Sequence, residues 1–140
     1  MTAVRLGAWR GVEVAAPAGD RPEEVFARRE AAVDAVVAAS EIEVPREAVR
    51  ARARQLWDAT CEELRARGTS PSAYLKLVDK DREQVLREAE PEARQSLARE
   101  AVLTAIADEI GLPGTGEDPG RLVGAVDAIL EHAEALRPGS

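Results

Sequence analysis

The chain has little of several features on which common kinds of protein chemistry depend. Its 140 residues include one cysteine, one histidine and only 3% aromatic side chains. A single cysteine, Cys61, excludes an intrachain disulfide, and the first residues lack the apolar core and cleavage site of a signal peptide. No apolar run approaches the roughly 20 residues that span a membrane. We therefore expect a soluble, cytoplasmic protein with no membrane partner.

The chain is rich in apolar and charged residues, a composition typical of helical proteins. Hydrophobic residues make up 45% of it and charged residues 32%, at a length that suits one domain. The net charge of −7 makes nucleic acid a poor partner, because phosphate binding needs a surplus of lysine and arginine. The basic run Arg50, Arg52 and Arg54 is therefore interpreted as a solvated helix face rather than a nucleic-acid site.

No group of residues has the spacing of a catalytic, cofactor or metal site. His132 has no potential ligand at the spacing of four residues that shares a helix face, and Cys61 has no nearby base. The loop at residues 114–116 lacks the lysine of a phosphate-binding loop. We expect no catalytic residue, no cofactor and no metal, and so no enzyme. A helical enzyme or ligand sensor would need convergent polar groups, which the sequence does not show.

Helical periodicity dominates from residue 20 onward, after an extended segment over residues 4–14. Pro45 suits the first helical position, Gly68 suits a helix end, and Pro91 predicts a kink or a new start. The predicted N-terminal caps are Asp20, Ser70, and either Asp79 or Asp81. The expected helices cover residues 20–40, 45–67, 70–78, 81–110 with a break at Pro91, and 118–136.

The expected organisation is an N-terminal segment, one helical domain and a short tail. The segment and its linker occupy residues 1–19, the domain residues 20–137, and the tail residues 138–140. Trp9 and Val12 have two readings. They pack the segment across the helices, or the segment pairs with a second copy at an open strand edge and forms a homodimer.

The order of these parts resembles the C-terminal domain of trigger factor, the bacterial ribosome-associated chaperone. That family has an arm helix ending in Val-Glu-Val-Pro or a similar element, a long helix with a glycine, a short Tyr-Leu helix, and an apolar helix ending in glycine. The corresponding segments are residues 31–45, which end in Glu43-Val44-Pro45, then residues 64–68, 73–75 and 103–111. The resemblance covers residues 26–112, and residues 4–14 are similar to the family's linker.

The resemblance implies an all-α helical bundle with long arm helices, of the trigger factor C-terminal or SurA-like class, with a short extended N-terminal segment. It also implies a chain without the ribosome-binding and prolyl isomerase domains, so we expect no direct ribosome docking. The family's role implies that unfolded or nascent polypeptides bind apolar surfaces between the arms. The residues expected to form these surfaces are Leu56, Trp57, Tyr74, Leu75, Leu77, Leu97 and Val102; the alternative is that they pack the core.

Two functions follow from this reading. The first is an ATP-independent, chaperone-like protein that shields unfolded polypeptides and, given its acidic charge, favours basic clients. The alternative is an assembly or adaptor module that binds one dedicated folded partner, in which case the chaperone ancestry is only structural.

Overall fold

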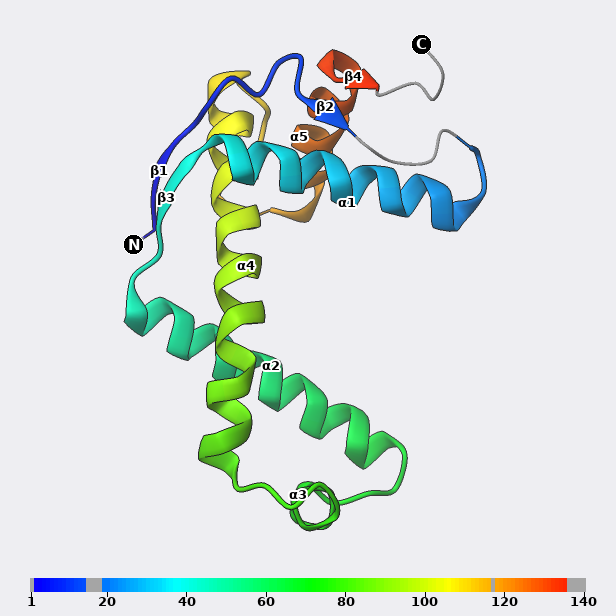
Figure 1. Ribbon diagram of the computed structural model, residues 1–140, viewed down its shortest axis with the longest axis vertical. Coiled ribbons are helices and arrows are strands. Elements are labelled where there is room, and N and C mark those ends of the chain that lie inside the picture. Colours follow the sequence, from blue (N-terminus) through cyan, green and yellow to red (C-terminus); the bar gives the residue numbers. More distant parts are fainter. Residues whose placement is uncertain (1, 15–18, 117, 136–140) are drawn as a thin grey trace. The chain divides into compact units, whose positions relative to one another are not determined.

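The computed structural model describes residues 2–14, 19–116 and 118–135, and its fold class is all-α, as expected (Figure 1). Two short two-stranded pairings accompany the helices. In one, β1 pairs antiparallel with β3; in the other, β2 pairs parallel with β4. The helices are α1 (Pro22–Ala39), α2 (Arg46–Ala66), α3 (Pro71–Leu77), α4 (Arg82–Glu109) and α5 (Pro119–His132). The strands are β1 (Ala3–Arg5), β2 (Glu13–Val14), β3 (Glu41–Glu43) and β4 (Glu134–Ala135).

The chain divides into two compact units that share the long helix α4. Unit 1 contains Val44–Leu97, and therefore α2, α3 and the N-terminal part of α4. Unit 2 contains Thr2–Glu43 together with the chain from Ala98 onward, and therefore α1, α5 and the C-terminal part of α4. The predicted division into a segment, one domain and a tail stays a prediction.

Unit 2 has the larger apolar core, built where α1, α5 and the C-terminal part of α4 meet. Val36, Val102, Ile106 and Ile129 are its fully buried large side chains. Buried residues lie one turn apart on each helix, in the pairs Ala32 and Val36, Val102 and Ile106, and Ala125 and Ile129, so that each helix buries one stripe. Trp9 is buried in the same core and Val12 packs against it. Both readings of these residues, packing across the helices and pairing with a second copy, stay predictions.

Unit 1 has a smaller core between α2 and the N-terminal part of α4. Val49, Ala53 and Ala93 are buried there, with Leu56 and Leu97 partly buried against them. Alanine at two of the three central positions allows the helix backbones to approach closely, but it contributes little apolar area. The core of unit 1 is therefore close-packed and small.

Local signals placed most helix ends correctly. Ser70 caps α3 by accepting a hydrogen bond from the Ala73 amide at 3.1 Å. Asp81 accepts one from the Gln84 amide at 2.8 Å at the start of α4, which decides between the two predicted aspartates. Gly68 takes a φ of +80° just after α2, as a left-handed helix end requires.

The prediction that Asp20 caps the first helix was wrong. The capping position is Arg21, whose side chain makes no capping hydrogen bond, and α1 begins at Pro22. Proline supplies a helical φ and has no amide to satisfy, so the helix starts directly at that residue. Asp20 therefore lies one residue before the capping position. Similarly, Pro45 is the capping residue of α2 and not its first helical residue.

Two predictions about where helices end were also wrong. The new helix start at Pro91, one of the two alternatives predicted there, does not occur, because α4 continues from Arg82 to Glu109. The other alternative, a kink at Pro91, stays a prediction. Pro91 is exposed, so the carbonyl that its missing amide leaves unpaired can be hydrated. The last helix ends at His132 rather than Leu136, because the chain turns extended at Ala133 and enters β4. Leu136 itself and the predicted tail lie outside the described residues.

Candidate functional site

The described residues hold no obvious chemical centre. Among them, no group of three or more His, Cys, Asp or Glu side chains could hold a metal ion. Cys61 is a free thiol buried in unit 1. No described helix is both long enough and apolar enough to cross a membrane. The candidate site must therefore be sought in exposed apolar surface, where a soluble protein normally leaves only scattered side chains.

Unit 2 has an apolar groove of about 270 Å³ between α1, α4 and α5. Phe26 and Val123 stand at this groove with 64% and 52% of their surface exposed, which is unusual for side chains of that size. Their exposure beside a hollowed apolar surface gives the groove the character of a binding site. Its apolar lining consists of Phe26, Val33, Leu103, Leu122, Val123 and Val126.

Ion pairs form the polar rim of this groove. Arg29 on α1 meets Asp127 on α5 at 2.8 Å. Arg99 on α4 donates to both carboxylate oxygens of Asp34 on α1, at 2.9 and 3.1 Å, and lies 3.6 Å from Glu30. Such partly exposed pairs each contribute little to stability. They do engage both rim arginines with carboxylates, so the groove presents mainly apolar surface.

The residues expected to bind clients lie in both units. In unit 1, the Trp57 and Tyr74 rings meet at a centroid distance of 6.2 Å. Leu56 and Leu97 pack on the core that Val49, Ala53 and Ala93 form in that unit. Val102 is fully buried in the core of unit 2, which fits the alternative reading for that residue.

Their exposure differs as much as their position. Trp57 is buried, Leu75 is half-buried, and Leu77 is 83% exposed. Leu77 is thus the expected residue that offers the most free surface. The structure contains no client, so the binding role of the whole set stays a prediction.

Sequence reasoning missed Phe26 and Val123 as surface residues. Phe26 lies seven residues before Val33, hence on nearly the same helix face, so periodicity alone predicts that it is packed. Its exposure depends on where the neighbouring helices end, which periodicity does not report. Val123 follows Leu122 directly on an apolar helix, and periodicity does not report which of the two the neighbouring helices leave uncovered.

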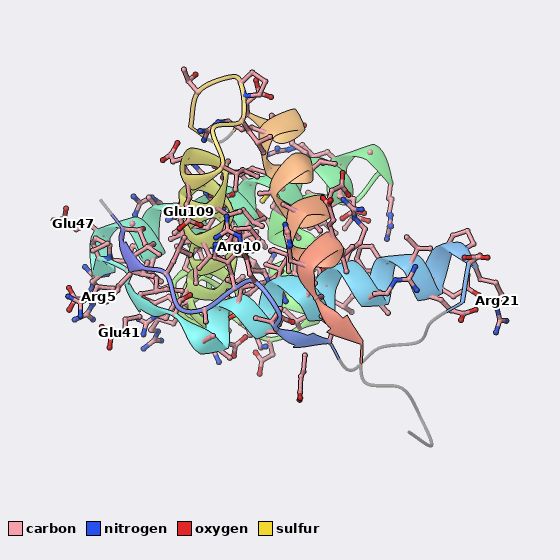
Figure 2. All side chains as sticks on the ribbon, turned by 90° about the horizontal axis from the view of Figure 1, so that it is seen from above. Arg5, Arg10, Arg21, Glu41, Glu47 and Glu109 are labelled. Atoms are coloured by element: carbon pink, nitrogen blue, oxygen red, sulfur yellow. The ribbon has the colours of Figure 1, made fainter. Side chains whose placement is uncertain are left out.

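The N-terminal segment is held on unit 2 by Trp9. Its indole Nε1 donates a hydrogen bond to Glu109 at 2.5 Å, and its ring meets His132 edge-on at a centroid distance of 5.8 Å. The Arg10 guanidinium lies 4.3 Å from the centre of the same ring and 3.5 Å from Glu109. Figure 2 shows Arg10 and Glu109 beside each other. The His132 side chain therefore packs against the Trp9 ring.

Lys80, in unit 1 and outside the groove, has a shifted pKa. Lys80 lies 2.6 Å from Glu88 in unit 1. The hydrogen bond to the Glu88 carboxylate, reinforced by its negative charge, raises the pKa of Lys80 above its ordinary value of 10.5. A lysine shifted in this direction stays protonated at neutral pH, so Lys80 has no character of a general base.

Comparison with known proteins points to one family. A family model described as the C-terminus of bacterial trigger factor protein matches residues 23–118, more than half of the chain. Trigger factor of Desulforudis audaxviator (strain MP104C) is 29% identical over 93 residues, which are 66% of this chain and 21% of that protein. The chain thus spans about a fifth of the length of that relative. No solved structure matches it significantly.

Proposed function

The chain belongs to the family of bacterial trigger factor C-terminal domains, and from this premise we propose that it is a chaperone-like protein that binds unfolded polypeptides without ATP. The observation that carries the proposal is the apolar groove of unit 2, with Phe26 and Val123 exposed at it. An unfolded chain displays short apolar segments that a folded protein would bury. Covering such a segment in the groove removes apolar surface from water on both sides.

The shape of the groove suits weak and general binding. It is open and shallow, it is lined by aliphatic side chains and one phenylalanine, and its rim charges are paired with one another. A surface with few directed polar groups selects for apolar character rather than for a particular sequence. Leu77 in unit 1 is a further exposed apolar side chain to which the same reasoning applies.

The proposal is tested by diluting an unrelated denatured protein into the chain and following light scattering. We expect protection from aggregation that depends on dose and needs no nucleotide. The double variant Phe26→Ser and Val123→Ser should lose at least half of this protection. Both side chains are largely exposed, so the double variant should keep its helical circular dichroism.

Ala38→Ser is the matched control, because Ala38 is an exposed residue of α1 that does not line the groove. It should protect as well as the unchanged protein. Leu77→Ser tests the separate contribution of unit 1. If a folded protein gives no protection at any ratio, the proposal is wrong and the adaptor for a single folded partner takes its place. A cytoplasmic location and a homodimer stay predictions.

A further inference from the structure

The net charge of −7 is divided unevenly between the two units. Val44–Leu97, in unit 1, has 11 lysines and arginines against 10 aspartates and glutamates, whereas the rest of the chain has 8 against 16. The first count gives +1 and the second −8, which together make −7. The acidity of the protein is therefore a property of unit 2, and unit 1 is free to present a surface of the opposite sign.

Unit 1 concentrates its positive charge along a groove between α2 and α4. The groove consists of two adjoining hollows of about 460 and 690 Å³, and Arg46, Arg87 and Glu90 line both of them. On α2 the arginines recur every four residues, so they share one helix face. The only acidic side chains of its lining are Glu83 and Glu90. The arginines are Arg46, Arg50, Arg54, Arg82, Arg87 and Arg94.

These arginines are exposed, and most of them form no ion pair with a described residue. Arg82 lies 3.9 Å from Glu83, but no other arginine of the groove forms an ion pair with any residue that the structure describes. Arg65 and Arg67, further along α2, behave differently: they pair with Glu62 at 2.8 Å and with Glu63 at 3.3 Å. Six arginines beside two glutamates leave an excess of positive charge in the groove, and an anionic ligand would relieve the repulsion among the arginines.

We propose that this arginine groove binds an acidic segment of a polypeptide. Guanidinium groups bind carboxylates through paired, charge-assisted hydrogen bonds, and arginines one helical turn apart can engage successive acidic side chains. From Arg46 to Arg54 the helix rises roughly 12 Å, which an extended peptide of about four residues spans. Leu86 and Ala53 line the groove between the charges and can pack against the aliphatic parts of that segment. This binding goes beyond the apolar groove of unit 2.

The observations favour an acidic peptide over a nucleic acid. Single-stranded nucleic acid is held by aromatic side chains on which its bases stack, and the residues that line this groove include none. A duplex carries about one negative charge per 1.7 Å over a long distance. A polyanion that extended beyond the groove would gain nothing from a chain whose remaining residues are strongly acidic. A short acidic stretch of polypeptide need not extend beyond the groove, so this limit does not apply to it.

The test measures fluorescence anisotropy of a labelled peptide of alternating glutamate and serine as the full chain is added. Matched peptides of alternating lysine and serine, and of serine with glycine, are the comparison ligands. We expect saturable binding of the acidic peptide only, weakening as salt rises. The variant Arg50→Gln with Arg87→Gln should lose about tenfold in affinity, because it removes charge-assisted contacts from both helices.

The matched control is Arg65→Gln with Arg67→Gln, which changes the charge of the chain equally but removes arginines already paired with glutamates. It should bind the acidic peptide within about twofold of the unchanged chain. Equal losses in the two variants would overturn the proposal, because only net charge would then matter. Tighter binding of a single-stranded RNA, lost in the Arg50 and Arg87 variant, would overturn it in favour of a nucleic-acid site. Retained aggregation protection in that variant would leave the apolar groove intact as a separate function.

Discussion

At the scale of single residues, Trp9 carries the attachment of the N-terminal segment to unit 2. It is buried in the core of that unit, and three polar or aromatic neighbours surround its ring. Two of these, Glu109 and His132, are about a hundred residues or more away along the chain. The β2–β4 pairing and the hydrogen bond from the Gly11 amide to the His132 carbonyl join the same parts of the chain, so Trp9 and these contacts together offset the entropy of closing a very long loop.

Replacing Trp9 with alanine should lower the free energy of unfolding by about 3 to 5 kcal/mol, because a large buried ring leaves a cavity. Trp9→Phe keeps most of the apolar contact but loses the hydrogen bond to Glu109, and should lose about 1 kcal/mol. Urea denaturation followed by circular dichroism measures both values. Arg10→Gln, which removes the cation over the ring, should cost less than either. A loss below about 1 kcal/mol for Trp9→Ala would show that the Trp9 side chain does not stabilise the attachment of the segment.

The ion pair between Lys80 and Glu88 predicts the direction in which the stability of the fold changes with pH. Glu88 raises the pKa of Lys80 in the folded protein, so its stabilisation is fully present below the ordinary value of 10.5 and is lost as pH rises through the folded pKa. We expect the difference in urea midpoint between the unchanged chain and Lys80→Met to be small, constant from neutral pH to about pH 10, and to vanish in stronger base. A difference that grew with pH would contradict the assigned pair.

The same residues show what a sequence can and cannot predict at this scale. The sequence predicts Ser70 as a cap and narrows the cap of α4 to Asp79 or Asp81, because each capping bond closes within three residues. The linker-packing reading of Trp9 required only that an apolar ring near the N-terminus be buried. Its partner Glu109 was unpredictable, because nothing local to either residue specifies the other. Phe26 was misassigned for a related reason, since its exposure depends on what the neighbouring helices fail to cover.

At the scale of elements, α4 shows tertiary context overriding a local signal. Pro91 predicts a break, yet the helix continues through it as one element from Arg82 to Glu109. Residues on both sides of Pro91 are engaged in packing: Ala89 and Ala93 contact the small core of unit 1. A restart would displace one of these contacts, and their retention offsets the cost of a missing backbone hydrogen bond. Sequence patterns identified the helix but not its continuity.

Pro91→Ala should therefore stabilise the chain, by up to about 3 kcal/mol, because it restores a backbone hydrogen bond and relieves the clash of the proline ring. Pro91 is exposed, so the change leaves side-chain packing undisturbed. The urea midpoint is the measurement. Pro71→Ala is the matched control: that proline stands in the first turn of α3, where it costs nothing, and its loss should leave stability unchanged or slightly lower. Destabilisation by Pro91→Ala would mean that the proline stabilises α4.

At the scale of the whole molecule, the two units differ in how much apolar surface they bury. Unit 2 buries a broad cluster that includes Val36, Val102, Ile106 and Ile129, whereas the cluster in unit 1 is Val49, Ala53 and Ala93. Apolar burial supplies most of the favourable free energy of folding, so the cooperative stability of the two units should differ. Composition and periodicity predict enough apolar residues for a core, but they do not predict how those residues are divided between the two units. That division depends on which helices meet, and α4 belongs to both units.

Native-state hydrogen exchange along α4 tests this difference within a single helix. Amides of residues 98–109, in unit 2, should be protected at least tenfold more than interior amides of residues 85–97, in unit 1, a difference of about 1.4 kcal/mol in opening free energy. Pro91, which has no amide hydrogen, is left out of the comparison. In Pro91→Ala the boundary between the two levels should persist, since it arises from core size and not from the proline. Equal protection along the whole helix would show instead that the chain opens as one cooperative body.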